Sequence, residues 1–383
     1  MTEQVRILFL VFHGFAEHNG ISKKIWGQIK GLRDAGPIVD LCSYEVMREG
    51  NRGWFINGEP LVLFGRTLWG KIKRRFAYQA LASYIDQQNY DLIYIRSDHN
   101  ANPFTIRFLR LLRKKKSRIV MEIPTYPYDG EYRGWRMQLE LAVDKLYRKK
   151  FASLLDGIVT FSDEKSIFGQ KTFRISNGID LSAVKIRTPR KNINNDDLNI
   201  IAVAEFHFWH GIDRAIRGLA CYMKKSVDPG IVLHMVGSFT DPNENLEIQS
   251  LIKNLGLQDN VLLYGNQWGE DLDRLFDQAD FAIGSLGRHR SGVTTIKTLK
   301  NREYAARGIP FVYSEQDSDF DGMPYVLKAP PDESPLNFVS IVNFLADYTF
   351  SAQQIRNSIR YLDWSQQMRS LLKSLDVHID NEC

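Results

Sequence analysis

The sequence predicts an α/β protein built from two doubly wound domains. Short apolar runs alternate with amphipathic stretches along the chain, which is the pattern of parallel strands joined by helices. A polar stretch at residues 190–197 interrupts this alternation, which then begins again. A length of 383 residues also exceeds what one ordinary core organises, and it suits two domains.

The first half predicts a parallel sheet covered on both faces by helices. After the first strand, Ile25, Trp26, Ile29 and Leu32 trace one face of a helix that Gly36 ends. A basic helix is expected at residues 105–115. The expected strands are residues 5–12, 39–43, 90–95, 118–123 and 157–161, followed by 173–176 and a turn at Asn177 and Gly178.

The second half repeats this topology, but not the sequence, of the first. Its clearest element is a helix at about 298–307, because Gly308 suits a left-handed C-terminal cap and Pro310 lies just beyond it. Other helices are expected at about 212–224, 244–255 and 270–278. The expected strands are residues 198–204, 231–236, 261–264, 281–285 and 311–314. Two such domains facing each other bind ligands in the cleft at the carboxyl ends of their strands.

The composition is that of a soluble globular protein, with 44% hydrophobic and 25% charged residues. The three cysteines, Cys42, Cys221 and Cys383, are scattered, with no CxxC pair and no zinc-ligand spacing. This usage fits a reducing compartment and argues against a disulfide framework or a structural metal. The apolar run at residues 7–12 is too short to span a bilayer, and no cleavable signal follows it. We therefore expect a cytoplasmic protein.

Charge is distributed unevenly along the chain. Residues 1–191 contain 33 lysines and arginines against 19 acidic residues, whereas the remainder is acidic and the whole chain carries +5. Dense basic runs occur at residues 71–75, 113–116 and 148–150. A solvated helix face explains each run, and peripheral contact with an anionic membrane surface is the functional alternative. Nucleic acid is not expected as a partner, because no nucleic-acid-binding motif accompanies the charge.

Two loops that each open a helix are candidates for binding anions. Residues 14–22 (GFAEHNGIS) follow the first strand, and Gly20 and Ile21 lie where the next helix begins. Residues 205–211 (EFHFWHG) hold the same place in the second domain, with Glu205 at the start and His210 directed at a phosphate. A tight structural turn explains the first loop equally well. A metal at the histidines lacks a further well-placed ligand.

Two further loops follow strands of the first half and are expected at the same cleft. Residues 96–99 (RSDH) end with His99. Residues 122–129 (EIPTYPYD) contain two prolines that stiffen a loop displaying Glu122, Tyr126 and Tyr128, a mixture suited to carbohydrate. A rigid structural loop with packed tyrosines is the alternative. The chain shows no Ser/His/Asp nucleophile arrangement and no GxSxG.

The helix at about 298–307 contains the strongest candidate for a ligand contact. A loop with glycine, serine and threonine at residues 291–295 precedes it and offers backbone N–H groups to phosphate. Glu303 lies beside Lys300 and Arg302 within the helix and can accept hydrogen bonds from a ribose diol. Together these groups indicate a sugar-nucleotide site. A surface helix with ordinary charges is the alternative.

Taken together, these motifs resemble the GT-B glycosyltransferases, and specifically the retaining enzymes of glycosyltransferase family 4. The resemblance covers most of the chain. It rests on the Gly20 loop, ISNGID at residues 175–180 (PNGVD in the family), WHGIDR at 209–214, Ala279-Asp280, REYAARGIPF at 302–311 (EAMA-x-G-x-P) and YLDW at 361–364. It implies two Rossmann-like domains, residues 1–180 joined by a C-terminal helix at about 362–383, and residues 181–361.

The resemblance implies transfer of a sugar from a nucleotide-sugar donor to a hydroxyl of a glycan or lipid-linked glycan, with retention of configuration and without a metal or other cofactor. It places the catalytic groups at Glu122, His99 and His210, and the acceptor or diphosphate loop at Gly20, Ile21, Tyr126 and Tyr128. Bacterial capsule, exopolysaccharide or lipopolysaccharide assembly is the implied setting. The donor residues it implies are Glu303, Lys300, Lys297, Arg290, Gly292, Val293, Thr294 and Glu205.

The sequence departs from the family at the donor phosphates. Members have an arginine and a lysine after the first strand of the second domain, where this chain has Glu205 and His210. The family's second glutamate is replaced by Thr295. We therefore expect the missing positive charge from Arg288, Arg290, Lys297 or Lys300. A sugar-nucleotide epimerase, or a non-catalytic sugar-nucleotide-binding subunit of a polysaccharide assembly complex, remains an alternative function.

Overall fold

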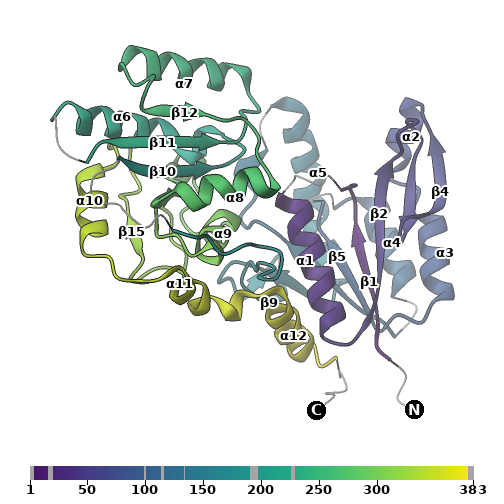
Figure 1. Ribbon diagram of the computed structural model, residues 1–383. Helices are drawn as coiled ribbons and strands as arrows, with labels where there is room; N and C mark the ends of the chain where they lie inside the picture. The colour runs from purple at the N-terminus through teal and green to yellow at the C-terminus, as the bar shows by residue number, and fades with distance from the viewer. Residues whose placement is uncertain are drawn as a thin grey trace. The chain divides into compact units, whose positions relative to one another are not determined.

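The computed structural model describes residues 4–15, 20–98, 101–113, 116–132, 134–189, 197–225 and 229–377. The chain forms two compact units (Figure 1). The first comprises residues 1–178 and 363–383, and the second comprises residues 179–362. His99 and most of the polar stretch at 190–197 lie outside the described residues.

The first unit contains a nine-stranded sheet in the order β4-β3-β2-β1-β5-β6-β7-β9-β8. Strands β2, β1, β5, β6, β7 and β9 run parallel, and β3-β4 and β8-β9 are antiparallel pairs at the edges. The strands are β1 (Arg6–Val11), β2 (Ile38–Val46), β3 (Arg52–Ile56), β4 (Glu59–Gly65), β5 (Leu92–Arg96), β6 (Arg118–Ile123), β7 (Gly157–Thr160), β8 (Ser166–Ile167) and β9 (Gln170–Arg174).

The edge hairpin β3-β4 was absent from the sequence-based expectation. Its turn is Asn57-Gly58, and both residues have positive φ angles, 51° and 88°. This is the backbone of a type I′ turn, which favours Asn-Gly and matches the twist of two antiparallel strands. The dipeptide therefore carried the signal for this hairpin.

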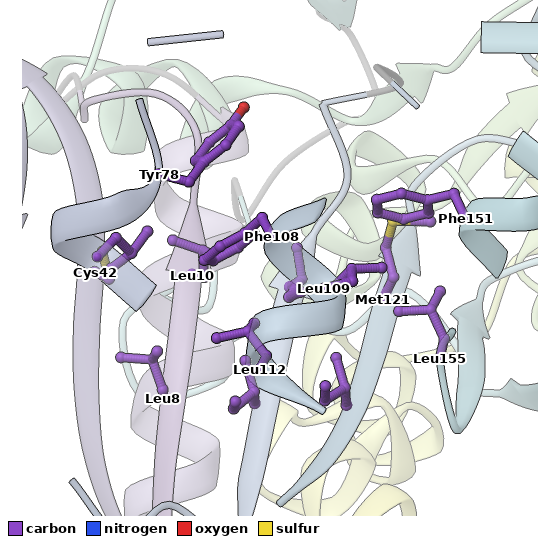
Figure 2. Packing of buried hydrophobic residues seen from close by; sticks show 14 of the residues in the cluster. Leu8, Leu10, Cys42, Tyr78, Phe108, Leu109, Leu112, Met121, Phe151 and Leu155 are labelled. Carbon is purple, nitrogen blue, oxygen red and sulfur yellow. The ribbon is translucent and has the colours of Figure 1, made fainter. Parts of the chain in front are cut away.

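Helices cover both faces of this sheet, and successive residues of β1 alternate between them. Leu8 and Leu10 pack in the core beneath α3, α4 and α5, whereas Ile7 and Phe9 pack in the core beneath α1 and α12. Figure 2 shows α4 side chains facing β1 and β6. The helices are α1 (Gly20–Asp34), α2 (Leu68–Lys73), α3 (Gln79–Gln87), α4 (Pro103–Leu112), α5 (Trp135–Ala152) and α12 (Trp364–Ser374), with a 3₁₀ turn η1 (Asp129–Glu131).

Helix α12 packs against α1, although the two are separated by most of the chain (Figure 1). The contact depends on Gly27 and Gly31 of α1, since an added Cβ would lie 2.3 Å from the Trp364 ring at the first position and 2.5 Å from the Trp364 carbonyl oxygen at the second. Trp26 differs from the expectation, because it lies on the exposed side of α1 and packs on Phe15 at 4.8 Å between ring centroids.

The second unit contains a six-stranded parallel sheet in the order β12-β11-β10-β13-β14-β15. Its strands are β10 (Leu198–Val203), β11 (Ile231–Val236), β12 (Val261–Leu263), β13 (Phe281–Ile283), β14 (Phe311–Tyr313) and β15 (Val326–Lys328). Its helices are α6 (Ile212–Met223), α7 (Pro242–Asn254), α8 (Gly269–Gln278), α9 (Leu299–Arg307), α10 (Phe338–Ala346) and α11 (Ala352–Ser358), with 3₁₀ turns η2 (Phe208–His210), η3 (Arg288–Ser291) and η4 (Arg360–Leu362).

The connection from α9 to β14 matches the sequence-based expectation for this segment. Gly308 caps α9 with φ of 76°, and the strand begins at Phe311. An added Cβ at Gly308 would lie 2.3 Å from the backbone oxygen of Ala352 in α11, so both the conformation and the space require glycine. The predicted class of two doubly wound α/β units is confirmed.

Candidate active site

Three loops meet at the carboxyl edge of the six-stranded sheet, where doubly wound folds bind ligands. They follow β10, β13 and β14, and β10 and β13 are neighbours although β11 and β12 intervene in the chain. Backbone hydrogen bonds join the loops: Leu286 N–H donates to the His210 carbonyl at 2.9 Å, and Ser314 N–H donates to the Ser285 carbonyl at 2.9 Å. The strand order thereby assembles one site from distant segments.

Gly211 lets the first of these loops approach the second closely. It has φ of 63°, and an added Cβ would lie 2.7 Å from the backbone nitrogen of Gly287. The side chain of Arg214, which is fully buried, then donates to the carbonyl oxygens of Leu286, Pro330 and Ser334. These contacts fix the backbone around His210.

His210 is buried and neutral at this edge. Its Nδ1 accepts a hydrogen bond from the His207 N–H at 3.0 Å, so the ring proton is on Nε2. Burial holds the pKa of His210 well below its ordinary value, and the charges of Lys300 and Arg288 lower it further. His210 can therefore donate a hydrogen bond from Nε2 to an anion without carrying a charge.

Glu315, which follows β14, is the residue of this edge that the sequence-based prediction missed. Its side chain is buried, and neither carboxylate oxygen has a hydrogen-bond partner among the described residues. Burial raises the pKa of Glu315, while the charges of Arg288 and Lys300 act in the opposite direction. Burial lowers the pKa of the half-buried Lys300, and the charge of Arg288 lowers it further.

Three further buried polar atoms, in the loop after β13 and around the start of α9, also have no hydrogen-bond partner in the part of the chain that the structure describes. These are Ser285 Oγ after β13, Thr298 Oγ1 at the start of α9, and Asn301 Oδ1. Most buried polar atoms in proteins are paired, and an unpaired one costs about 1–3 kcal/mol. Their concentration at one sheet edge, beside two cations, indicates a site that a polar anionic ligand would complete.

A buried ion-pair network holds the loop after β14 against α9. The guanidinium of Arg302, which is fully buried, pairs with Asp317 and Asp319, and Asn301 Nδ2 donates to Asp317 at 3.3 Å. Lys297 Nζ lies 3.6 Å from Asp319. Lys297 is thus committed to this network, which positions the segment containing Glu315.

Glu303 lies on α9, about one turn after Lys300. It is half-buried and pairs with Arg307 of the same helix at 3.0 Å. Arg307 also pairs with Asp273 of α8 at 2.6 Å. The carboxylate of Glu303 is therefore held in a fixed place with part of its surface open.

Two groups expected at the donor site have partners within the protein. The guanidinium of Arg290, expected to bind phosphate, is engaged by Asp213 at 2.8 and 3.0 Å and by Glu333. The amides of Gly292 and Val293 were expected to face the ligand, but they donate to the carbonyls of the preceding 3₁₀ turn η3. A short turn closing on itself uses these N–H groups internally.

The remaining residues of this loop pair with the segment after β14. Gln316 N–H donates to the Thr294 carbonyl at 2.8 Å, and Ile296 N–H donates to the Gln316 carbonyl at 3.0 Å. Thr295 itself is exposed. Glu205, at the end of β10, is exposed and accepts a hydrogen bond from Thr240 at 2.7 Å.

In the first unit, the expectation that Glu122 is displayed in a loop is wrong. Glu122 belongs to β6 and is fully buried, with Lys24 Nζ at 3.1 Å, Arg96 at 2.8 Å, Gln28 at 2.6 Å and the Tyr94 hydroxyl at 2.5 Å. Burial alone would raise the pKa of Glu122, but the two cations outweigh it and lower this pKa to about 2. Glu122 is a buried structural anion that ties β5, β6 and α1 together.

The tyrosines of the following loop are also more buried than expected. Tyr128 is buried and donates to Asp144 at 2.7 Å, whereas Tyr126 is half-buried with its ring 5.7 Å from that of Phe168. Gly20 and Ile21 begin α1 and are exposed. The packed alternative therefore describes Tyr128.

The residues that the structure describes contain no cluster of three or more histidine, cysteine, aspartate or glutamate side chains suited to a metal ion. In the same residues, no helix combines the length and the apolar character that crossing a bilayer requires.

The second unit matches a known family at the level of sequence. Residues 185–312 match the family described as glycosyl transferases group 1, which is one third of the chain and includes His210, Lys300 and Glu303. No curated protein sequence matches the chain.

Solved structures match both units. The catalytic domain of starch synthase IV from Arabidopsis thaliana, bound to ADP and acarbose, aligns with a TM-score of 0.67 and 11% identity over 98% of each chain. Sucrose-phosphate synthase from Thermosynechococcus elongatus aligns with a TM-score of 0.63 and 18% identity over 97% of this chain and 95% of that chain. HepE of Anabaena in complex with UDP-glucose gives a TM-score of 0.59 and 16% identity over 98% and 100%. The chain thus has the GT-B fold of glycosyltransferases.

Proposed function

We propose that this protein is a glycosyltransferase that moves a sugar from a nucleotide-sugar donor to a hydroxyl of a glycan or lipid-linked glycan, with retention of configuration. The observation that carries the proposal is the buried polar cluster around Glu315 and Lys300, at the carboxyl edge of the second unit. The family match over residues 185–312, the UDP-glucose bound by one structure of similar fold and the ADP bound by another support a nucleotide sugar as the ligand.

The donor contacts follow from the chemistry of each side chain. Glu303 accepts hydrogen bonds from the ribose diol, because its carboxylate is held in place and partly open. The diphosphate is stabilised by Lys300, Arg288 and the Nε2–H of His210. These groups lie at one edge of the sheet, and each is either a cation or a hydrogen-bond donor. Glu315 completes the hydrogen bonds of the transferred sugar.

In the proposed reaction, the bond between the anomeric carbon and the donor's β-phosphate oxygen breaks. The acceptor hydroxyl oxygen bonds to that carbon on the same face, and its proton goes to the leaving phosphate. The protein's main task is then to stabilise the growing charge on the diphosphate, an effect of the type that usually contributes most to catalysis. No metal or other cofactor takes part in this proposal.

The proposed acceptor contacts come from the first unit, at Gly20, Ile21, His99 and Tyr126. Glu122 and Tyr128 support this region from within the core instead of touching the substrate. The proposal places the protein in the cytoplasm of a bacterium, in polysaccharide assembly, with its basic first unit in peripheral contact with an anionic membrane.

A thermal-shift screen across nucleotide sugars and nucleoside diphosphates tests the donor site, because a ligand of the folded state raises the melting temperature. Glu303→Gln should weaken the binding of the stabilising donor about tenfold to a hundredfold, the loss of hydrogen bonds to a charged group. Glu247→Gln, at an exposed position of α7, is the matched control.

The reaction itself is tested by incubating the purified chain with that donor and a panel of glycan acceptors. Retention appears as the donor's anomeric configuration in the product's NMR spectrum. Stabilisation by no nucleotide ligand would refute the donor site, an epimerised donor without acceptor would indicate an epimerase, and a bound donor that is never turned over would indicate a binding subunit.

A further inference from the structure

Helix α5 of the first unit has apolar residues on two opposite sides. Its inward side is formed by the four buried residues Leu141, Asp144, Phe151 and Ala152. The opposite side carries an apolar stripe that the rest of the structure leaves uncovered. Trp135, Leu139 and Leu146 of this stripe are 70%, 59% and 72% exposed, and Val143 is also exposed. Their spacing of four, four and three residues places them on one helical face.

Helix α2 presents a second exposed apolar group. Leu68 and Trp69 are 78% and 68% exposed, and Ile72 lies one turn further along on the same side. The segment after α2 is tied to α5 by an ion pair of 2.6 Å between Arg75 and Glu140. Both helices lie at the upper end of the first unit in Figure 1. We call the exposed apolar residues of these two helices the α2–α5 face.

Basic residues surround this face. Residues 66–76 contain five lysines and arginines and no acidic residue, and residues 133–152 contain six against two acidic ones. Of these, Lys73, Lys149 and Lys150 are exposed, and Lys145 is exposed but pairs with Asp129 at 3.1 Å. The two acidic residues are compensated, since Glu140 pairs with Arg75, and Asp144 is buried against Tyr128. The free charge of the face is therefore positive.

We infer that the α2–α5 face docks the protein on the surface of an anionic phospholipid bilayer. Tryptophan and leucine on a helix flanked by lysines form the residue set that lies in a membrane interface, where the apolar side chains enter the acyl boundary and the cations contact lipid phosphates. Nucleic acid would use the cations but not the apolar stripe. This inference deepens the membrane contact proposed above and rests on that part of the proposal alone.

Binding to vesicles tests the inference. The full chain is sedimented with vesicles of phosphatidylglycerol and phosphatidylcholine, and with vesicles of phosphatidylcholine alone. We expect binding to the anionic vesicles that weakens as salt is added, because salt screens exposed charges. The double variant Leu139→Glu/Leu146→Glu should bind about tenfold or more weakly, since it removes two apolar anchors and adds repulsion.

A second double variant separates the contribution of charge to vesicle binding from that of apolar contact. Lys149→Glu/Lys150→Glu should weaken binding about tenfold to a hundredfold, because each basic residue near an anionic surface raises the affinity about fivefold. Leu246→Glu and Lys253→Glu are the matched controls, because both residues are exposed on α7 in the other unit. Because all of these positions are exposed, the substitutions should leave the melting temperature unchanged. Measuring it shows whether each variant is folded.

Three outcomes would overturn the inference. The wild-type chain fails to bind anionic vesicles at low salt, or the α5 variants bind as well as the controls. In the third, the wild type is a dimer, Leu139→Glu/Leu146→Glu makes it a monomer, and neither the wild type nor any variant binds vesicles. The α2–α5 face would then join two copies of the chain. Transfer of sugar to a water-soluble acceptor is measured in parallel, so that failure of the proposed reaction and failure of membrane docking are distinguished.

Discussion

The pKa of Lys300 makes donor affinity depend on pH in a direction that the structure fixes. Burial and the neighbouring Arg288 lower this pKa in the free protein from its ordinary value of 10.5. A diphosphate at this site favours the ammonium form and raises the pKa again. Above the pKa of the free state, the protein must therefore take up a proton in order to bind the nucleotide.

The expected magnitude follows from this linkage. Affinity for a nucleoside diphosphate should fall by up to about tenfold for each pH unit above the lowered pKa, which corresponds to about 1.4 kcal/mol per unit. The loss proceeds from near neutrality toward the ordinary lysine value and ends once pH passes the pKa of the bound state. The phosphate group of the ligand titrates near pH 6, so measurements above about pH 7.5 separate the two effects.

Isothermal titration calorimetry of the stabilising nucleotide is the assay. In two buffers of different ionisation enthalpy, the wild type should take up as much as one proton per nucleotide bound, and Lys300→Met should bind weakly with no such uptake. Lys297→Met is the control, because Lys297 is paired with Asp319 and should leave the pH slope unchanged. Equal slopes for wild type and Lys300→Met would show that Lys300 does not contact the diphosphate.

Three stability predictions concern the scaffold, each measured by urea denaturation. Arg302→Met should lower the free energy of unfolding by about 3–5 kcal/mol, because it leaves two buried aspartates without their cation, and a loss below about 1 kcal/mol would contradict this. Glu122→Gln should cost a similar amount, since Lys24 stays buried without its anion, and a neutral result would mean that solvent reaches this cluster. Gly31→Ala should destabilise by about 1–3 kcal/mol through its clash with Trp364, whereas helix propensity alone predicts stabilisation, so the sign decides.

Local sequence signals were sufficient for the frame of the fold. The buried strands are continuous apolar runs, and the end of α9 is marked by Gly308, whose backbone conformation and close contact both exclude other residues. The β3-β4 hairpin carried an equally local signal in Asn57-Gly58. Trp26 was misplaced because helical spacing alone does not locate the boundary of a buried face.

The charged residues of the candidate site depended on contacts that spacing does not reveal. Arg290 pairs with Glu333, 43 residues further along the chain. Glu122 lies at the end of a strand as expected, but α1 covers it with Lys24. Glu315 follows an apolar strand like many surface residues, and only the tertiary fold shows that its carboxylate is buried and unpaired.

The return of α12 to the first unit has a consequence for how the chain folds during synthesis. The second unit is an insertion whose two ends are adjacent, since Ile179 N–H donates to the Leu362 carbonyl at 2.9 Å. It needs no residue after 362 in order to close. Most of the first unit, residues 1–178, is translated before the second unit. The surface of α1 at Gly27 and Gly31 nevertheless stays uncovered until Trp364 has been made and α12 packs on it. The domain that begins first is therefore the one that finishes last.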